Sequence, residues 1–275
     1  MKRILHVFFA LFALVFIAQA AKVEKVTVNS AAMKKNIDNI VVVPDGVNAE
    51  TKLPTVFLLH GAGGNASDWI NNVPDIKKLS DLYQVLIVCP DGGVTSWYYD
   101  SPIDSSYKYE TYVTKELLPY IDQKYPTYKS AAYRAITGLS MGGHGGMYLS
   151  LRHQDLFAAG GSMSGGVDIR PFPKNWDISK RLGTIEEKPE NWEKYTIVNM
   201  LDLLKGSNLK LIIDCGVNDF FYDVNMDLHN RLLKMKYPHD FITRPGVHNW
   251  PYWSNAVKYQ FLFFNEVFHS KPSRR

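Results

Sequence analysis

A short glycine-flanked serine segment carries the strongest chemical signal in the chain. Residues 138–142 read Gly-Leu-Ser-Met-Gly, which is a G-x-S-x-G pattern. The segment follows an apolar run predicted to be a strand and precedes a predicted helix, the setting in which this motif presents a nucleophile. A tight turn there would strain Ser140, expose its hydroxyl and place it at a helix N-terminus that favours developing negative charge. We predict that Ser140 is a nucleophile; the alternative is an ordinary glycine-rich turn.

A serine hydroxyl becomes a good nucleophile only when a base takes its proton. The chain holds eight histidines. His248 follows the last predicted strand and precedes the last predicted helix, so it should lie at the carboxyl edge of the sheet, where ligands bind in open parallel sheets. His248 is therefore the predicted general base. His60 is expected to support its own turn, and His144 to pack in the core or to line the site.

The third group of such a site is a carboxylate that orients the histidine. Residues 214–219 read Asp-Cys-Gly-Val-Asn-Asp and follow a predicted strand that lies between Ser140 and His248 in the sequence. Asp214 closes that strand and is expected to make local turn hydrogen bonds. Asp219 lies further out in the loop and has the better reach. We therefore predict Asp219 as the acid and keep Asp214 as the alternative.

Two backbone N–H groups should stabilise the oxyanion that forms when a carbonyl is attacked. One is expected from Met141, directly after the nucleophile. The other is expected from residues 60–64, which read His-Gly-Ala-Gly-Gly and follow a predicted strand. Ala62 is the first choice, with Gly61 and Gly63 as alternatives. A phosphate-binding loop is disfavoured because the Lys and the Ser or Thr that end such a loop are missing.

The segments that must position these groups alternate between two patterns. Short apolar runs bounded by glycine and proline, typical of strands buried on both faces, cover residues 40–43, 56–59, 85–89, 133–137, 209–213 and 241–244. Apolar residues at helical spacing predict helices over 109–124, 141–152, 224–236 and 253–268. This alternation predicts an α/β fold with a mostly parallel sheet. Residues 165–207 are expected to form an insertion over one end of the sheet; a separate small domain is the alternative.

The composition of the 275-residue chain narrows the class of protein. Hydrophobic residues make up 46% and charged residues 21%, as in folded domains, so disorder, collagen and coiled coil are disfavoured. The formal net charge is +4 and no Lys/Arg block occurs, so nucleic-acid binding is not expected. Neither a metal-ligand spacing nor a dinucleotide fingerprint is present, and no metal or other cofactor is expected. Cys89 and Cys215 are expected to be free buried thiols, with a disulfide as the alternative.

The first twenty residues have the pattern of a cleavable signal peptide. A basic start at Lys2 and Arg3 precedes an almost wholly apolar run over 4–18, and Ala-Gln-Ala at 18–20 is a small-x-small cleavage site. We expect residues 1–20 to be removed, leaving 21–275 as one domain that is secreted or periplasmic without stable membrane insertion. An uncleaved anchor is the alternative. The oligomeric state is left open.

Together these motifs resemble the esterase D-like group of α/β-hydrolases, which includes tributyrin esterase-like proteins, feruloyl and acetylxylan esterases, S-formylglutathione hydrolases and mycolyltransferases. The resemblance spans about residues 35–270 and rests on segments 59–64, 96–98 with 109–110, 138–143, 214–216 with 219–220, and 246–250. It implies helices on both faces of the sheet and triad roles for Ser140, Asp219 and His248. Val247 replaces a glycine expected before the histidine. The signal peptide argues against a cytosolic formylglutathione role.

Three functions fit these residues. The first is hydrolysis of small-molecule or polysaccharide-linked carboxylic esters, with short acyl or hydroxycinnamoyl groups on a carbohydrate as the expected substrate. The second is transfer of the acyl group to a sugar or lipid hydroxyl, and the third is a catalytically silent carbohydrate-binding protein. Trp97 and Trp250 come from loops at the predicted carboxyl edge and are the expected substrate-binding rings, because flat aromatic faces stack on sugars and aryl acids. Packing in the core is the alternative for the aromatic residues of both loops.

Overall fold

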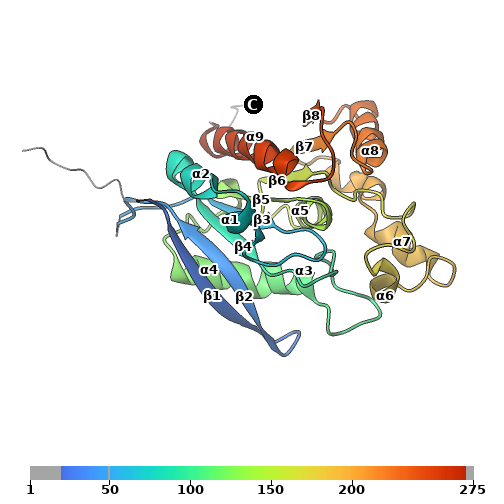
Figure 1. Cartoon of the computed structure of the whole chain (residues 1–275), viewed down its shortest axis with the longest axis horizontal. Coiled ribbons are helices and arrows are strands. Elements are labelled where there is room, and N and C mark those ends of the chain that lie inside the picture. The colour runs from blue at the N-terminus through green and yellow to red at the C-terminus, as the bar shows by residue number, and fades with distance from the viewer. Residues whose placement is uncertain (1–19, 49, 271–275) are drawn as a thin grey trace, which may run out of the picture.

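The computed structural model describes residues 20–48 and 50–270, so the predicted signal peptide lies, except for its last residue, outside the described residues. The core is one eight-stranded sheet with the order β1-β2-β4-β3-β5-β6-β7-β8 (Figure 1). Its strands are β1 (Lys22–Ser30), β2 (Lys35–Val43), β3 (Thr55–Leu59), β4 (Leu86–Pro90), β5 (Arg134–Gly138), β6 (Ala159–Met163), β7 (Lys210–Gly216) and β8 (Asp240–Arg244). Strands β1 and β2 pair antiparallel and β3 to β8 run parallel, which confirms the predicted mostly parallel sheet.

Helices cover both faces of the sheet, as the resemblance implies. They are α1 (Asp68–Asn72), α2 (Ile76–Tyr83), α3 (Tyr109–Thr111), α4 (Leu118–Lys124), α5 (Met141–Arg152), α6 (Ile178–Leu182), α7 (Pro189–Tyr195), α8 (Tyr222–Lys234) and α9 (Trp250–His269). Apolar side chains of α1, α2 and α9 pack in one core cluster, and those of α4, α5 and α8 pack in the other. In Figure 1, α2 and α9 lie at the top of the view, and α4 lies on the opposite side of the sheet.

The predicted helix over 109–124 is one continuous helical segment with a widened turn inside it. A π-helical turn, η1 (Tyr112–Leu117), joins α3 to α4. Pro119 lies in the first turn of α4, two residues after the π-helical turn ends, and has no N–H to donate to a carbonyl of the preceding turn. The helix therefore departs from regular α-helical hydrogen bonding just before this proline.

Two strands, β1 and β6, and four helices, α1, α2, α6 and α7, were not predicted. β6 reads Ala-Gly-Gly-Ser-Met and lacks an apolar run, because α5 and α9 cross it closely: a Cβ on Gly160 would collide with Ser150, and one on Gly161 with Gln260. β1 alternates exposed and buried residues at the edge of the sheet. α1 and α6 have five residues each and α7 has seven, too few to show a clear helical period. α2 has eight residues and was missed although its sequence is amphipathic.

Residues 165–207 form the predicted insertion between β6 and β7. They hold α6, α7 and two 3₁₀ turns, η3 (Ile197–Asn199) and η4 (Leu201–Leu204), and lie beside one end of the sheet (Figure 1). Trp192 is fully buried in the same core cluster as α5, so the insertion packs on the main body.

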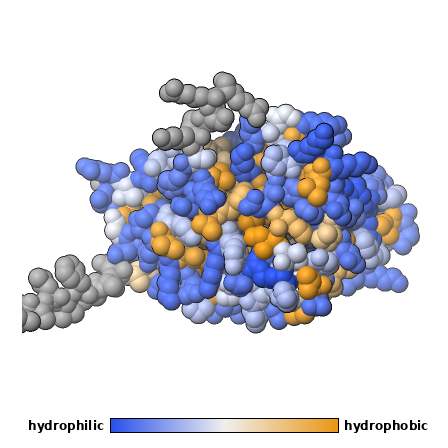
Figure 2. All heavy atoms as spheres, turned by 90° about the horizontal axis from the view of Figure 1, so that it is seen from above, coloured by the Kyte–Doolittle hydropathy of each residue, from blue (hydrophilic) through white to orange (hydrophobic). Residues whose placement is uncertain are grey.

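The two cysteines are free and buried, on strands separated in the sheet by β3, β5 and β6. Within the part of the chain that the structure describes, no helix is both long and apolar enough to cross a membrane. Hydrophilic residues cover most of the face drawn in Figure 2, and hydrophobic residues gather mainly near its middle.

Candidate active site

Ser140 lies on the sharp turn between β5 and α5. Its backbone has φ 55° and ψ −117°, in the left-handed half of the map that non-glycine residues rarely occupy. The turn is held because the Ser140 N–H donates to the carbonyl of Met163, at 2.9 Å. A Cβ on Gly138 or on Gly142 would come within 2.6 Å and 2.5 Å of the Leu59 carbonyl oxygen. The glycines of the motif are therefore needed for close packing of the turn on β3.

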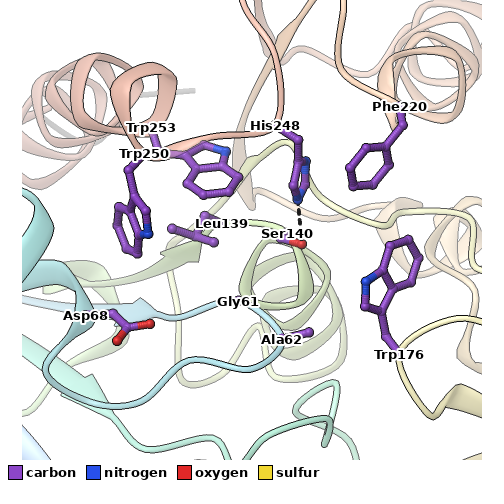
Figure 3. Close-up of a pocket in the computed structure, with 10 residues that line it drawn as sticks. All are labelled: Gly61, Ala62, Asp68, Leu139, Ser140, Trp176, Phe220, His248, Trp250 and Trp253. Carbon is purple, nitrogen blue, oxygen red and sulfur yellow. Dashed lines mark hydrogen bonds between the residues drawn. The ribbon is translucent and has the colours of Figure 1, made fainter.

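Three predicted residues meet in one hydrogen-bonded row. The Ser140 hydroxyl lies 2.9 Å from Nε2 of His248 (Figure 3). On the other side of the ring, Nδ1 of His248 lies 2.9 Å and 3.0 Å from the two carboxylate oxygens of Asp219. The Asp219 side chain is fully buried and that of His248 is 15% exposed. This burial strengthens the interaction between the carboxylate and the ring.

The loops that carry Asp219 and His248 are bound to each other through their backbones. The Asn218 N–H donates to the carbonyl of Gly246, at 3.0 Å, and the Val217 N–H donates to the carbonyl of Arg244, at 3.0 Å. The Phe221 N–H donates to a carboxylate oxygen of Asp219, at 2.8 Å, which leaves that carboxylate oriented toward the histidine. Both loops follow neighbouring parallel strands, β7 and β8, at the carboxyl edge of the sheet.

Asp214, the alternative acid, does not contact His248. Its carboxylate accepts a hydrogen bond from the Tyr252 hydroxyl, at 2.5 Å, and pairs with Arg244. The expectation of local turn hydrogen bonds was wrong for this side chain, because its partners come from β8 and α9. Burial raises the pKa of Asp214 to about 6, while the Tyr252 hydroxyl and the Arg244 guanidinium oppose that rise. Asp214 ties the strand before the acid loop to the start of α9.

The two predicted oxyanion donors, Ala62 and Met141, have backbone N–H groups that no hydrogen bond in the described residues occupies. Ala62 and Gly61 line the same pocket as Ser140, and the Ala62 N–H donates to no acceptor within residues 20–48 and 50–270. Met141 is the first residue of α5, where N–H groups have no intrahelical acceptor. The N–H of Gly63, an alternative donor, is already bonded to the carbonyl of Val94, at 2.8 Å.

The contacts of His60 and His144 indicate that both rings have structural roles. Nε2 of His60 accepts from the Gly92 N–H and Nδ1 donates to the Gly61 carbonyl, each at 2.8 Å, so the ring joins the Ala62 loop to the loop after β4. His144 is fully buried, and burial lowers its pKa to about 4. Neither ring lies among the residues that line the pocket.

The pocket at Ser140 is walled by aromatic rings (Figure 3). Its volume is about 400 Å³, and it is lined by Gly61, Ala62, Asp68, Leu139, Ser140, Trp176, Phe220, His248, Trp250 and Trp253. Trp176 and Phe220 lie on one side of Ser140, and Trp250 and Trp253 lie on the other. The arrangement can hold an ester with its carbonyl at Ser140 and an apolar or flat group against either wall. The described residues contain no group of three or more metal-binding side chains.

The expectation for Trp97 needs correction, whereas Trp250 lies on the pocket wall. Trp97 is only 1% exposed and packs edge to face on His144, with ring centroids 5.3 Å apart. Trp176, which packs against Trp97 at 6.1 Å, lines the pocket instead. Sequence reasoning missed Trp176, Phe220 and Asp68 as lining residues. Only the position of Phe220 directly after the predicted acid gave a signal.

Comparisons with known proteins agree with this geometry. The Esterase family model, described as "Putative esterase", matches residues 30–264. An acetyl esterase of Caldicellulosiruptor saccharolyticus is 26% identical over 265 residues, covering 86% of this chain and 96% of that protein. A ferulic acid esterase structure superposes with a TM-score of 0.77 at 30% identity, covering 90% of this chain and 98% of the other.

The fold itself recurs in more distant structures. FphF, a fluorophosphonate-binding serine hydrolase of Staphylococcus aureus, superposes with a TM-score of 0.80 at 21% identity, covering 90% of this chain and 99% of that chain. The family match covers most of the chain, and the relatives that share the sequence are esterases. The chain therefore belongs to this esterase family and is a carboxylic ester hydrolase with the α/β-hydrolase fold.

Proposed function

We propose that the chain hydrolyses esters through an acyl-enzyme on Ser140, with His248 as general base and acid and Asp219 as its orienting partner. The observation that carries the proposal is the continuous row of hydrogen bonds from Ser140 through His248 to Asp219. Because Asp219 holds Nδ1–H, Nε2 is left as an acceptor that faces the serine hydroxyl. The same row supports proton transfer in both directions.

The reaction then takes two steps. As Oγ of Ser140 attacks the ester carbonyl carbon, His248 takes the hydroxyl proton and passes it to the alcohol oxygen when the carbon–oxygen bond breaks. Water next gives a proton to His248 and attacks the acyl carbon, and the proton returns to Ser140 as the free acid leaves. In both steps the N–H groups of Ala62 and Met141 stabilise the negative carbonyl oxygen.

Short acyl or hydroxycinnamoyl esters of carbohydrates are the proposed substrates. A cavity of about 400 Å³ with walls of tryptophan and phenylalanine accommodates an acetyl or aryl acid better than a long aliphatic chain. The related acetyl esterase and ferulic acid esterase act, by their names, on esters of these two kinds. Leu139 is the one large aliphatic side chain among the lining residues.

A panel of esters tests this proposal directly. We expect kcat/KM of the purified protein to be highest for acetyl or feruloyl esters, to fall from butyryl to decanoyl esters, and to rise when the leaving group is a sugar. A maximum at long acyl chains with no gain from the sugar would instead indicate a lipase. Recovery of an acylated acceptor sugar in place of free acid would indicate an acyltransferase.

We also propose that the mature protein is exported and begins at Ala21. Ala20 is exposed, whereas Ala21 is 1% exposed and its N–H donates to a carboxylate oxygen of Asp81, at 3.0 Å. Cleavage before Ala21 would turn this amide into an α-ammonium group facing a carboxylate, which supports a stable processed end. Sequencing the N-terminus of protein from its native host tests export, and retention of Met1 would contradict it.

A further inference from the structure

The two sides of the pocket differ in polarity. Trp176 and Phe220 stack with ring centroids 5.7 Å apart and planes 21° apart, and Phe220 also packs on His248 at 4.1 Å. Among the lining residues drawn in Figure 3, these two rings lie on this side of His248 and Ser140, and neither carries a charge. On the other side, Asp68 lies below the ring of Trp250. An ester has one acyl part and one alcohol part, so the apolar side suits the acyl group and the side of Asp68 suits the alcohol.

Among the described residues that line this pocket, Asp68 is the only one with a carboxylate. It is half-buried at the start of α1, and its side chain accepts no hydrogen bond and forms no ion pair with any residue in 20–48 or 50–270. Neither lysine nor arginine lines the pocket. A partly buried carboxylate that has lost some water and gained no partner gives a bound molecule with O–H groups a favourable site.

Trp250 is held in place beside this carboxylate. Its ring packs edge to face on Trp69, at 5.3 Å and 88°, and on Trp253, at 5.4 Å and 88°. Trp69 is fully buried and its indole N–H donates to the carbonyl of Leu59, at 3.0 Å. A ring fixed in this way provides a flat apolar surface at little entropic cost when a ligand binds.

We infer that Asp68 and Trp250 bind the alcohol part of the ester and select an uncharged, hydroxylated alcohol such as a sugar ring. Asp68 accepts hydrogen bonds from its hydroxyl groups while Trp250 contacts its apolar face. The same carboxylate repels a leaving group that carries a negative charge. This inference rests on the proposed ester hydrolysis and adds the residues that discriminate among alcohols.

The effect of the Asp68 charge on selectivity is measured with two acetates that share one ring, methyl 4-acetoxybenzoate and the 4-acetoxybenzoate anion. Their intrinsic reactivities differ, but that difference is the same for every enzyme variant and cancels when ratios of kcat/KM are compared. In Asp68→Asn we expect the preference for the neutral ester to fall about three- to tenfold, and the change should shrink in 0.5 M salt. Asp202→Asn is the matched control, because this exposed carboxylate does not line the pocket.

The effect of hydrogen bonding to the sugar is measured as the ratio of kcat/KM for methyl 6-O-acetylglucoside to kcat/KM for ethyl acetate. We expect the wild type to prefer the sugar ester, Asp68→Ala to lose about tenfold of that preference, and Asp68→Asn to keep part of it, because the amide oxygen still accepts a hydrogen bond. Trp250→Leu should lose the sugar preference while leaving the charge preference, since it removes the ring and not the carboxylate.

The outcomes separate this inference from the proposed function. If the wild type cleaves the simple acetates but both selectivity ratios are unchanged in Asp68→Asn, Asp68→Ala and Trp250→Leu, the assignment of Asp68 and Trp250 is overturned and ester hydrolysis stands. If the folded wild type cleaves none of the esters, the proposed function itself is wrong. Labelling of each variant by a fluorophosphonate reports that its site is folded.

Discussion

Ser140, Asp219 and His248 come from loops after three different strands, yet each was predictable from its own local pattern. Ser140 is set by its flanking glycines, and His248 by its place between the last strand and the last helix. The choice between Asp214 and Asp219 depended only on how far each side chain could extend from its strand. In the structure, a carboxylate oxygen of Asp219 lies 2.9 Å from Nδ1 of His248. Local sequence thus predicts which residues can react, because strand ends at one sheet edge bring them together.

Replacing each of the two aspartates separates their roles. We expect Asp219→Asn to lower kcat by roughly 10³ to 10⁴, because the neutral amide neither stabilises the charged imidazole nor holds the correct tautomer. Asp214→Asn should keep most of kcat and lose thermal stability, since Asp214 contacts Arg244 and Tyr252 and not His248. Steady-state kinetics and melting curves of both variants check this. Full activity in Asp219→Asn together with loss in Asp214→Asn would reverse the assignment.

The pocket walls were far less predictable than the triad. Trp97 follows a strand end and was expected to touch substrate, but it is buried beneath Trp176 from the insertion. Asp68 lies on a five-residue helix and carries no motif. Which side chain reaches the pocket depends on how loops from distant parts of the chain stack on one another, and no local periodicity records that.

At the scale of elements, the ring of His60 helps to hold the loop at 60–64 in place. His60 accepts from Gly92 and donates to Gly61, so it joins the loop that carries Ala62 to the loop after β4. We expect His60→Ala to lower kcat by about tenfold or more with little change in KM, because a misplaced Ala62 N–H stabilises the transition state less well than the bound substrate. His60→Gln should recover part of kcat. A rise in KM alone would contradict this role.

The start of β1 provides a second test at this scale. Asp81 on α2 accepts from the Ala21 N–H at 3.0 Å and from the Asp45 N–H at 2.8 Å. In a chain that begins at Ala21, we expect Asp81→Asn to cost about 0.5–1 kcal/mol more in free energy of unfolding than in a chain with two residues added before Ala21. Urea unfolding of the wild type and of Asp81→Asn, each with and without the two added residues, measures this difference in free energy. Equal costs in both backgrounds would show that the processed end gains nothing from Asp81.

The central strands were predicted because their own sequences mark them, whereas β1 and β6 were missed because their position in the sheet determines their sequences. The central strands are continuous apolar runs because both of their faces are covered. β6 has glycines where α5 and α9 approach too closely for side chains, so its sequence resembles a turn. The edge strand β1 keeps polar residues on one side. These exceptions follow from neighbours that the local sequence does not contain.

At the scale of the whole molecule, Glu110 links α3 to α5 and makes stability depend on pH. Its carboxylate accepts hydrogen bonds from the side chains of Tyr148, Arg152 and His153, at 2.8, 2.8 and 2.7 Å. Burial alone would raise the pKa of Glu110, but these partners outweigh it and lower the pKa from 4.5 to about 2. The stabilisation is therefore full above about pH 4.5 and is lost as the pH falls toward 2.

Comparison with Glu110→Gln isolates this contribution from that of other carboxylates. At pH 7 we expect the wild type to exceed the variant by roughly 2–4 kcal/mol in free energy of unfolding, since the variant leaves Arg152 and His153 without their anion. The difference should narrow steadily between pH 4.5 and pH 2.5. Urea titrations at four pH values measure it, and a gap that is constant or grows on acidification would contradict the account.

The central claim is that esters are cleaved through an acyl-enzyme on Ser140. Rapid quenching of the purified protein with 4-nitrophenyl acetate, followed by intact mass and peptide mapping, measures this directly. We predict a transient gain of one acetyl group located on the peptide that contains Ser140, at a rate that matches turnover, and no such gain in Ser140→Ala, which should be nearly inactive while keeping its fold. Undiminished hydrolysis by Ser140→Ala, or an acetyl group that forms at turnover rate on another residue, would contradict the account.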